Sequence, residues 1–278
     1  TNPLHKRKTC CNRKVGGLMQ VGASSSCFFP LLTEKSLDNV LSLGFKQAEV
    51  FFNTSSELEE PFVKELKKNA DDHGAKILSV HPFSSALESN CIFAEYERRY
   101  DDFIGLYQKH FHAAALLGAK NVVIHGSVAV QKRNMSEEFY FDRFASLVEL
   151  GKKEGVNVCQ ENVVRFRSQS VDFLKKMRAY LGDDFHMVFD IKQAIRSGYD
   201  PFYVAEEFKN EIAHIHLSDN TPEVDCMPPG RGTFDFKRLF QIMNNADYKG
   251  GYVIEIYSKG YDVMKELALS KEYLDSIK

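Results

Sequence analysis

One alternation runs through almost the whole chain: a short apolar run is followed by an amphipathic segment of helical length, eight times over. The apolar runs predict strands at residues 19–24, 47–52, 76–81, 121–125, 157–162, 186–190, 212–217 and 252–257. The segments between them predict helices from Thr33 and at about 61–73, 95–117, 136–154, 170–180, 201–209, 235–246 and 261–276. Strands and helices that alternate in this way build a parallel sheet. The sequence therefore predicts an α/β fold.

The alternation favours a closed (β/α)8 TIM barrel over a doubly wound open sheet. An open sheet that binds a nucleotide should carry a glycine-rich fingerprint after its first strand, and the segment at 21–24, VGAS, does not match G-x-G-x-x-G. The length of 278 residues suits a barrel, since such barrels typically need about 250. No linker or change of composition follows residue 19, so residues 19–278 are predicted to form a single domain.

The amino-terminal segment differs from the rest in charge. Residues 1–18 contain five basic residues and no acidic one, and we expect them to be a disordered or non-native leader. Without those five, 31 basic residues face 38 acidic ones, a net charge of −7. An acidic body argues against a nucleic-acid partner, because phosphate contacts need clustered Lys and Arg. No apolar stretch reaches the 18 or more residues of a membrane span, so no membrane partner is expected.

The cysteines indicate a reducing compartment. The six cysteines show neither a CxxC pair nor the spacing of a disulfide framework. Scattered thiols of this kind are typical of cytoplasmic proteins, and the opening segment lacks the apolar core of a secretory signal. We therefore expect a cytoplasmic protein with reduced thiols.

Acidic and imidazole side chains mark seven consecutive predicted strands. They are Glu49, His81, His125, Glu161, Asp190, His216 and Glu255. In a (β/α)8 barrel, reactive groups gather at the carboxyl ends of the strands, so these side chains should meet at one mouth. Carboxylates crowded together repel one another, and a bound cation removes that conflict. The pattern predicts a metal centre at the barrel mouth.

With these residues identified, the chain resembles the xylose isomerase-like barrel superfamily of sugar and sugar-phosphate isomerases, epimerases and apurinic endonucleases. The resemblance covers nearly everything from Met19 onward. The segments that carry it are SVHP at 79–82, VIHG at 123–126, EN at 161–162, FD at 189–190 through GYD at 198–200, HIHLSD at 214–219, PGRGTFD at 229–235 and VIE at 253–255.

The resemblance implies four ligands for one divalent metal ion: Glu161, Asp190, His216 and Glu255. Three carboxylates and one imidazole favour Mn²⁺ or Mg²⁺, with Co²⁺ or Zn²⁺ as alternatives. The resemblance also implies a metal-dependent isomerase or epimerase, in which Glu161 and Glu255 exchange a proton through an enediolate. The expected substrates are a sugar, a sugar phosphate or a polyol, and relatives often form homo-oligomers.

Six further residues are expected to contact the substrate: His81, His125, Lys192, Gln193, Arg231 and Glu49. His81 and His125 match two zinc-binding histidines of the endonuclease branch. They either hydrogen-bond substrate hydroxyls or Glu161, or they hold a second metal ion that Glu161 bridges. Glu49 is expected at the rim. Phe28, Phe29, Phe51, Phe52 and Phe83 are expected near the mouth, as core or as an apolar wall for a sugar.

Three alternatives to the isomerase or epimerase stay open. A dehydratase of the inosose type would use the same site. An apurinic endonuclease is disfavoured, because Gln193 and the segment 225–227 (DCM) lack two of the three side chains for that branch's third metal. A sugar-binding barrel without turnover is supported only by replacement of the histidine and arginine that hold the sugar in ketose epimerases, at Gln193 and near Cys226.

Overall fold

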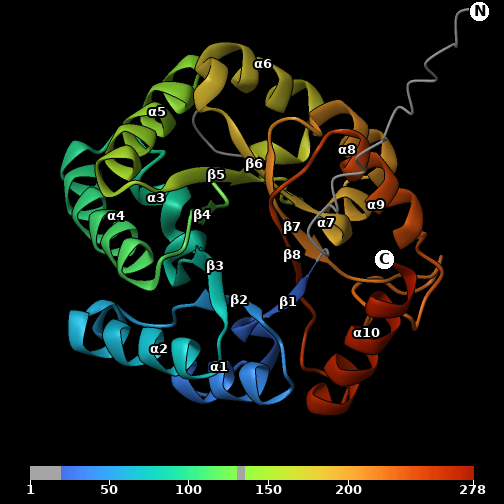
Figure 1. Ribbon diagram of the computed structural model, residues 1–278. Coiled ribbons are helices and arrows are strands. Elements are labelled where there is room, and N and C mark those ends of the chain that lie inside the picture. Colours follow the sequence, from blue (N-terminus) through green and yellow to red (C-terminus); the bar gives the residue numbers. More distant parts are fainter. Residues whose placement is uncertain (1–19, 130–134) are drawn as a thin grey trace, which may run out of the picture.

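The computed structural model describes residues 20–129 and 135–278, and these residues form a closed eight-stranded barrel (Figure 1). Each strand pairs in parallel with the next, and β1 pairs with β8 to close the ring. The strands are β1 Val21–Ser24, β2 Gln47–Phe51, β3 Lys76–His81, β4 Asn121–Ile124, β5 Asn157–Glu161, β6 His186–Asp190, β7 Ile212–Leu217 and β8 Gly251–Ile254. The predicted (β/α)8 TIM barrel is confirmed.

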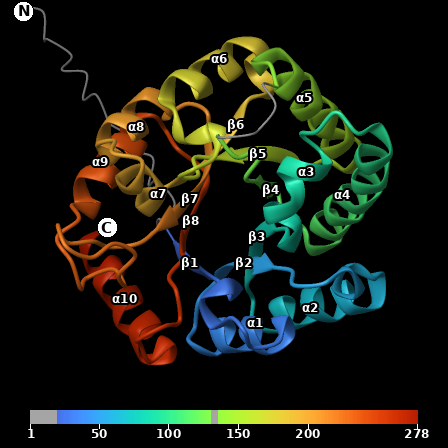
Figure 2. The ribbon, with the colours of Figure 1, turned by 180° about the vertical axis from the view of Figure 1, so that it is seen from behind.

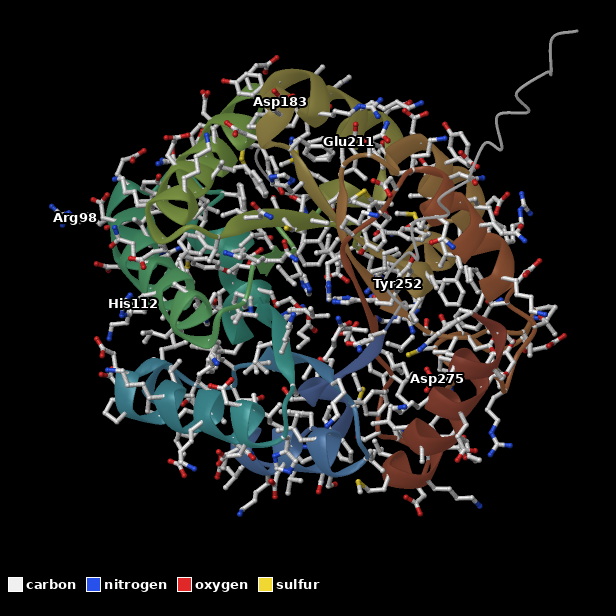
Figure 3. The ribbon with its side chains drawn as sticks, in the orientation of Figure 1. Arg98, His112, Asp183, Glu211, Tyr252 and Asp275 are labelled. Carbon is white, nitrogen blue, oxygen red and sulfur yellow. The ribbon has the colours of Figure 1, made fainter. Side chains whose placement is uncertain are left out.

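Helices surround the strands on the outside, as the two opposite views show (Figures 1 and 2). They are α1 Thr33–Ser42, α2 Glu60–Asp72, α3 Glu88–Cys91, α4 Glu97–Leu117, α5 Glu137–Glu154, α6 Val171–Leu181, α7 Ile191–Arg196, α8 Pro201–Phe208, α9 Phe236–Asn245 and α10 Val263–Ile277. Charged side chains such as Arg98 project outward from this ring (Figure 3). Within residues 20–129 and 135–278, no helix has the length and apolar character needed to cross a membrane.

Short-range signals in the sequence set the ends of several helices. The hydroxyl of Ser136 accepts a hydrogen bond from the N–H of Phe139 and caps α5, which ends at Gly155 with a φ of 72°. Glycine is favoured there because an L side chain disfavours the left-handed conformation. α4 ends in the same way at Gly118, with a φ of 74°.

Three differences between the structure and the predicted elements affect the site. α3 and α7 are short helices that the sequence analysis did not predict, and they follow β3 and β6. β8 ends at Ile254 rather than 257, so Glu255 begins the loop after the strand. The prediction for residues 1–18 lies outside the described residues.

The apolar core has two parts. The larger lies between the strands and the surrounding helices, and the smaller consists of Val123, Cys159 and Val188, with Ala213 packed against them. Side chains alternate along a strand, so residues two positions further along point to the same face. Glu161 follows Cys159 by two residues and Asp190 follows Val188 by two, so these carboxylates lie in the next layer, directly above an apolar floor.

Candidate metal centre

Four ionisable side chains meet at the carboxyl ends of the strands. Glu161 ends β5, Asp190 ends β6, His216 lies near the end of β7, and Glu255 follows β8. One nitrogen or oxygen atom from each lies within 4.8 Å of the others. All four are buried except Glu255, whose side chain is 14% exposed. The structure thus brings together the four residues expected to bind a metal ion.

The ring of His216 is oriented by a buried carboxylate on its far side. Its Nε2 lies 3.1 Å from Oε2 of Glu49, and because a carboxylate only accepts, Nε2 carries the proton. Its Nδ1 therefore faces the cluster, 3.4 Å from Oε1 of Glu161, 3.6 Å from Oδ2 of Asp190 and 3.3 Å from Oε2 of Glu255. Nδ1 makes no hydrogen bond of good geometry with the described residues.

Asp190 is held in place from both sides of its backbone. The side chain of Asn162 donates to the Asp190 carbonyl at 3.0 Å and accepts from its N–H at 2.8 Å. Oδ1 of Asp190 caps α7 by accepting from the N–H of Gln193 at 2.9 Å. Oδ2 remains to face the cluster.

A second group of ligand atoms adjoins the first. His81, His125 and Glu161 also offer atoms within 4.8 Å of one another. Nε2 of His125 lies 2.8 Å from Oε2 of Glu161 and 3.1 Å from Nε2 of His81. Behind them the buried carboxylate of Glu88 accepts hydrogen bonds from the N–H of Gly126 and from the hydroxyl of Tyr107. Glu161 therefore connects the two groups, and Glu88 fixes the backbone that follows β4.

The pKa values in the cluster follow from burial and from opposite charges. Burial alone would raise the pKa of Glu161, but His125 and His216 hold it well below its usual range. Burial would likewise lower the pKa of His216, yet Glu49 and Glu255 raise it well above its ordinary value. The pKa of Asp190 is raised, chiefly by burial. Glu161 and Asp190 therefore stay ionised in this buried site only if positive charge lies beside them.

The residues present fit a divalent cation. The three carboxylates raise the pKa of His216, which favours a second proton on Nδ1, and a divalent cation bound to Nδ1 would replace that proton as the positive charge beside them. Three carboxylates and one imidazole nitrogen are suitable ligands for Mn²⁺ or Mg²⁺. Glu49 then plays the part of the carboxylates that commonly hold a metal-binding histidine in place.

A cavity of about 330 Å³ opens onto the cluster. Its size falls within the range of about 300–1,000 Å³ typical of small-molecule sites. Six of the predicted site residues line it: His81, His125, Glu161, Lys192, Gln193 and Glu255. Aromatic and polar side chains complete the lining: Phe29, Phe51, Tyr257, Ser26 and Ser85, with Ile256.

Two predicted substrate contacts lie elsewhere. Glu49 is not at the rim; it is fully buried beneath His216 and accepts a hydrogen bond from Ser79 at 2.7 Å. Arg231 pairs with Glu266 through two hydrogen bonds of 2.8 Å and does not line the cavity among the described residues. Both side chains are occupied with other protein groups.

The N–H groups of the glycine-rich segment near Arg231 also have hydrogen-bond partners within the protein. The carboxylate of Asp219 accepts hydrogen bonds from the N–H groups of Gly230 at 2.8 Å and Gly232 at 2.9 Å. It also accepts from the N–H of Phe234 at 3.0 Å. An internal carboxylate therefore fills the position in which these N–H groups would otherwise hold a phosphate.

Four residues in or beside the site were not predicted from the sequence: Ser26, Ser85, Glu88 and Tyr257. Ser26, Ser85 and Glu88 belong to short helical turns beyond the strands, which no periodicity marks, and Tyr257 lies in the loop after β8 although a strand was predicted to reach it. Of the predicted aromatic group, Phe29 and Phe51 line the cavity, and Phe51 packs on His81 with ring centroids 4.8 Å apart. Phe52 and Phe83 instead pack around His110, and Phe28 packs against the main core.

Comparison with known proteins agrees with this architecture. Residues 37–278 match the model of a family described as xylose isomerase-like TIM barrel. An inosose dehydratase of Clostridium botulinum is 23% identical over 255 residues, 80% of this chain and 81% of that protein. Another, of Bacillus cereus, is 25% identical over 223 residues, 68% of this chain and 72% of that protein.

Solved structures with the same fold include sugar epimerases. The 3-keto-D-glucoside 4-epimerase of E. coli superimposes with a TM-score of 0.74 at 18% identity, covering 93% of this chain and 99% of that one. A D-tagatose 3-epimerase-like protein gives a TM-score of 0.76 at 22% identity, covering 93% and 98%. The family match extends over most of the sequence, and the chain belongs to the xylose isomerase-like TIM barrel family.

Proposed function

We propose that the protein is a cytoplasmic, divalent-metal-dependent isomerase or epimerase that moves a proton on a carbon next to the carbonyl of a sugar. One observation carries this proposal: Glu161, Asp190, His216 and Glu255 each offer a ligand atom within 4.8 Å of the others, and two of them, Glu161 and Glu255, line a cavity. The described cysteines are free, as in a reducing compartment.

Glu161 and Glu255 would transfer the proton, because both line the cavity and they come from different strand ends. A divalent cation held by Glu161, Asp190, His216 and Glu255 would supply Lewis acidity at the carbonyl oxygen. Oε2 of Glu255 faces His216 and Lys192, so we assign proton exchange to its other oxygen, Oε1. Glu161 would exchange a proton from the other side of the site.

The neighbouring residues would orient the sugar. His125 and Gln193 line the cavity beside the two glutamates and can hydrogen-bond hydroxyl groups. The carbonyl oxygen of the Gln193 side chain accepts from the N–H of Val164 at 3.1 Å, which leaves its NH₂ group to donate. Phe29, Phe51 and Tyr257 provide apolar surface for the C–H face of a ring.

The cavity favours a sugar or polyol without a phosphate. Lys192 is the one lysine or arginine that lines it within residues 20–129 and 135–278, so the cavity offers a phosphate at most one ammonium group. Arg231 and the N–H groups of Gly230 and Gly232 have partners inside the protein. A phosphate would find few free donors here.

Dehydration of an inosose is the second candidate. It is favoured by the relatives named inosose dehydratase, one of which matches 80% of the chain. Removal of the same α-proton followed by loss of a β-hydroxyl would use the same two glutamates. An endonuclease is less well supported, because Asp225, which could have served a third metal ion, pairs with Arg196 at 2.5 and 2.9 Å.

Solvent hydrogen exchange tests the proposal. The purified protein with added Mn²⁺ is incubated in D₂O with a panel of ketoses and inososes, and NMR follows deuterium at the carbon next to the carbonyl. We expect exchange with at least one compound, and the product separates an epimer, an isomer and a dehydrated ketone.

Glu161→Gln and Glu255→Gln should each slow this exchange by about 10²–10⁴-fold, the usual contribution of general acid–base catalysis. Glu60→Gln serves as the matched control, because Glu60 pairs with Lys64 on the surface of α2. Exchange that persists in both site variants contradicts the assignment of the two glutamates. Binding of a sugar without exchange favours a barrel that binds but does not turn over.

A further inference from the structure

Lys192, which was expected to contact the substrate, lies at the edge of the metal centre. It is the second residue of α7 and is only 3% exposed. Its Nζ contacts Oδ2 of Asp190 and lies 2.5 Å from Oε2 of Glu255. The ammonium group therefore joins two of the three carboxylates of the cluster.

The two oxygens that Lys192 contacts are the ones that face His216. Oδ2 of Asp190 and Oε2 of Glu255 lie 3.6 and 3.3 Å from Nδ1 of His216. A cation between His216 and the carboxylates would bind these same two oxygens. The ammonium group and a divalent cation thus need the same atoms.

The geometry points to Lys192 as an internal cation that holds the carboxylates of Asp190 and Glu255 when no metal is bound and must release them when a divalent metal binds. This inference rests on the proposed metal centre. Repulsion between the ammonium group and a divalent ion a few ångströms away adds to the competition for oxygens, because the site is shielded from water.

The cavity beside Lys192 can accept its ammonium group after release. Lys192 lines the cavity, and its Nζ lies 5.9 Å from the centre of the Tyr257 ring on the cavity wall. α7 is fixed at its start by the capping of Asp190, so the side chain would move while the helix stays. Metal binding would therefore turn a buried ammonium group into one that faces the substrate.

Metal affinity gives the direct test. Free Mn²⁺ is measured by electron paramagnetic resonance during titration of metal-free wild-type protein, Lys192→Met and Arg196→Met. Lys192→Met should bind Mn²⁺ about 10–100-fold more tightly, since it removes a charge-assisted hydrogen bond that competes with the metal. Arg196 lies on the same helix but pairs with Asp225, so Arg196→Met should change the affinity by less than about twofold.

The outcomes separate the two hypotheses. Tighter binding in Lys192→Met alone supports the inference. Unchanged or weaker binding in Lys192→Met, while the wild type binds Mn²⁺, overturns the role of Lys192 and leaves the metal centre intact. A lack of Mn²⁺ binding by all three proteins overturns the metal centre and the inference together.

A chemical probe of the wild type needs no substitution. Acetic anhydride labels accessible lysines, and mass spectrometry compares Lys192 with and without Mn²⁺. We expect Lys192 to be protected in the metal-free protein and labelled several-fold more with Mn²⁺. Lys176, which pairs with Glu137 on the surface, should be labelled equally in both. Equal labelling of Lys192 in the two states contradicts the release of its ammonium group.

Discussion

At the residue scale, the site depends on a carboxylate that no substrate can reach. Glu49 is fully buried, and its Oε2 accepts from Nε2 of His216 at 3.1 Å and from Ser79 at 2.7 Å. His214 lies close to the same oxygen at 3.3 Å. His216 and His214 hold the pKa of Glu49 well below its usual range, against the effect of burial. Glu49 therefore stays charged and determines which nitrogen of His216 faces the cluster.

Glu49→Gln should weaken metal binding about 10–100-fold, a range typical of residues that hold metal-binding histidines. The amide is close to the carboxylate in size but has no charge. It can turn its NH₂ group toward Nε2 of His216, which would then accept a hydrogen bond, and the proton of the ring would move to Nδ1. Mn²⁺ titration measures the effect, with Glu60→Gln as the control. An affinity equal to that of the wild type would show that Glu49 does not orient His216.

The sequence identified the acids and imidazoles of the site but misplaced Glu49. Glu161, Asp190 and His216 could be predicted because the ends of their apolar strands are easy to recognise. Glu49 lies two residues before the end of β2, where Phe51 pairs in register with His81 and Glu49 with Ser79. Its depth thus depends on strand register, including an irregularity between Ala48 and Glu49, which the sequence does not reveal.

At the element scale, α4 contributes a buried histidine to the layer behind the site. His110 is fully buried, and its two ring nitrogens have no hydrogen-bond partner within the described part of the chain. The rings of Phe52, Phe83 and Tyr107 surround it at centroid distances of 5.7–6.0 Å. Burial, with a smaller effect of His81, lowers the pKa of His110 to about 3. The folded protein therefore keeps this ring neutral.

This burial should make the fold sensitive to acid. Since the pKa is about 3 in the folded chain and near 6.5 when unfolded, the unfolded chain binds the extra proton between these values. His110 therefore costs stability as the pH falls below 6.5, by up to about 1.4 kcal/mol per pH unit until about pH 3.

His110→Phe should remove this part of the acid destabilisation. Urea denaturation at a series of pH values measures the free energy of unfolding, and the variant should lose less stability than the wild type below pH 6.5. His112→Phe is the control, because His112 lies on the same helix but is 44% exposed and contacts Glu154. An identical pH slope in His110→Phe and the wild type would contradict this account.

The sequence predicts the long helices but not the short ones. α4 and α5 are long and amphipathic and end at glycines, so the sequence predicts them well. α7 has only six residues and is too short for its periodicity to be recognised. It begins because Asp190 caps it, and the same helix places Lys192 beside the metal centre. The unexpected role of Lys192 therefore follows from an element that the pattern could not predict.

At the scale of the whole molecule, closure of the barrel creates the site. β1 pairs with β8 and closes the ring of strands (Figure 1). The ends of β5, β6 and β8 thereby surround one centre, where Glu161, Asp190 and Glu255 meet. The alternation of eight strands was enough to predict this closure. The pairing partners of Lys192 and Arg231 could not be predicted, because they depend on loops whose course is set by three-dimensional packing.

Metal content tests the central claim most directly. The purified protein and a Glu161→Gln/Glu255→Gln double variant are incubated with Mn²⁺, freed of excess metal and analysed by inductively coupled plasma mass spectrometry. The account predicts about one equivalent of metal per chain in the wild type and its loss in the variant, with Glu60→Gln behaving like the wild type. A wild-type protein that retains no divalent metal, or a double variant that retains as much, would contradict it.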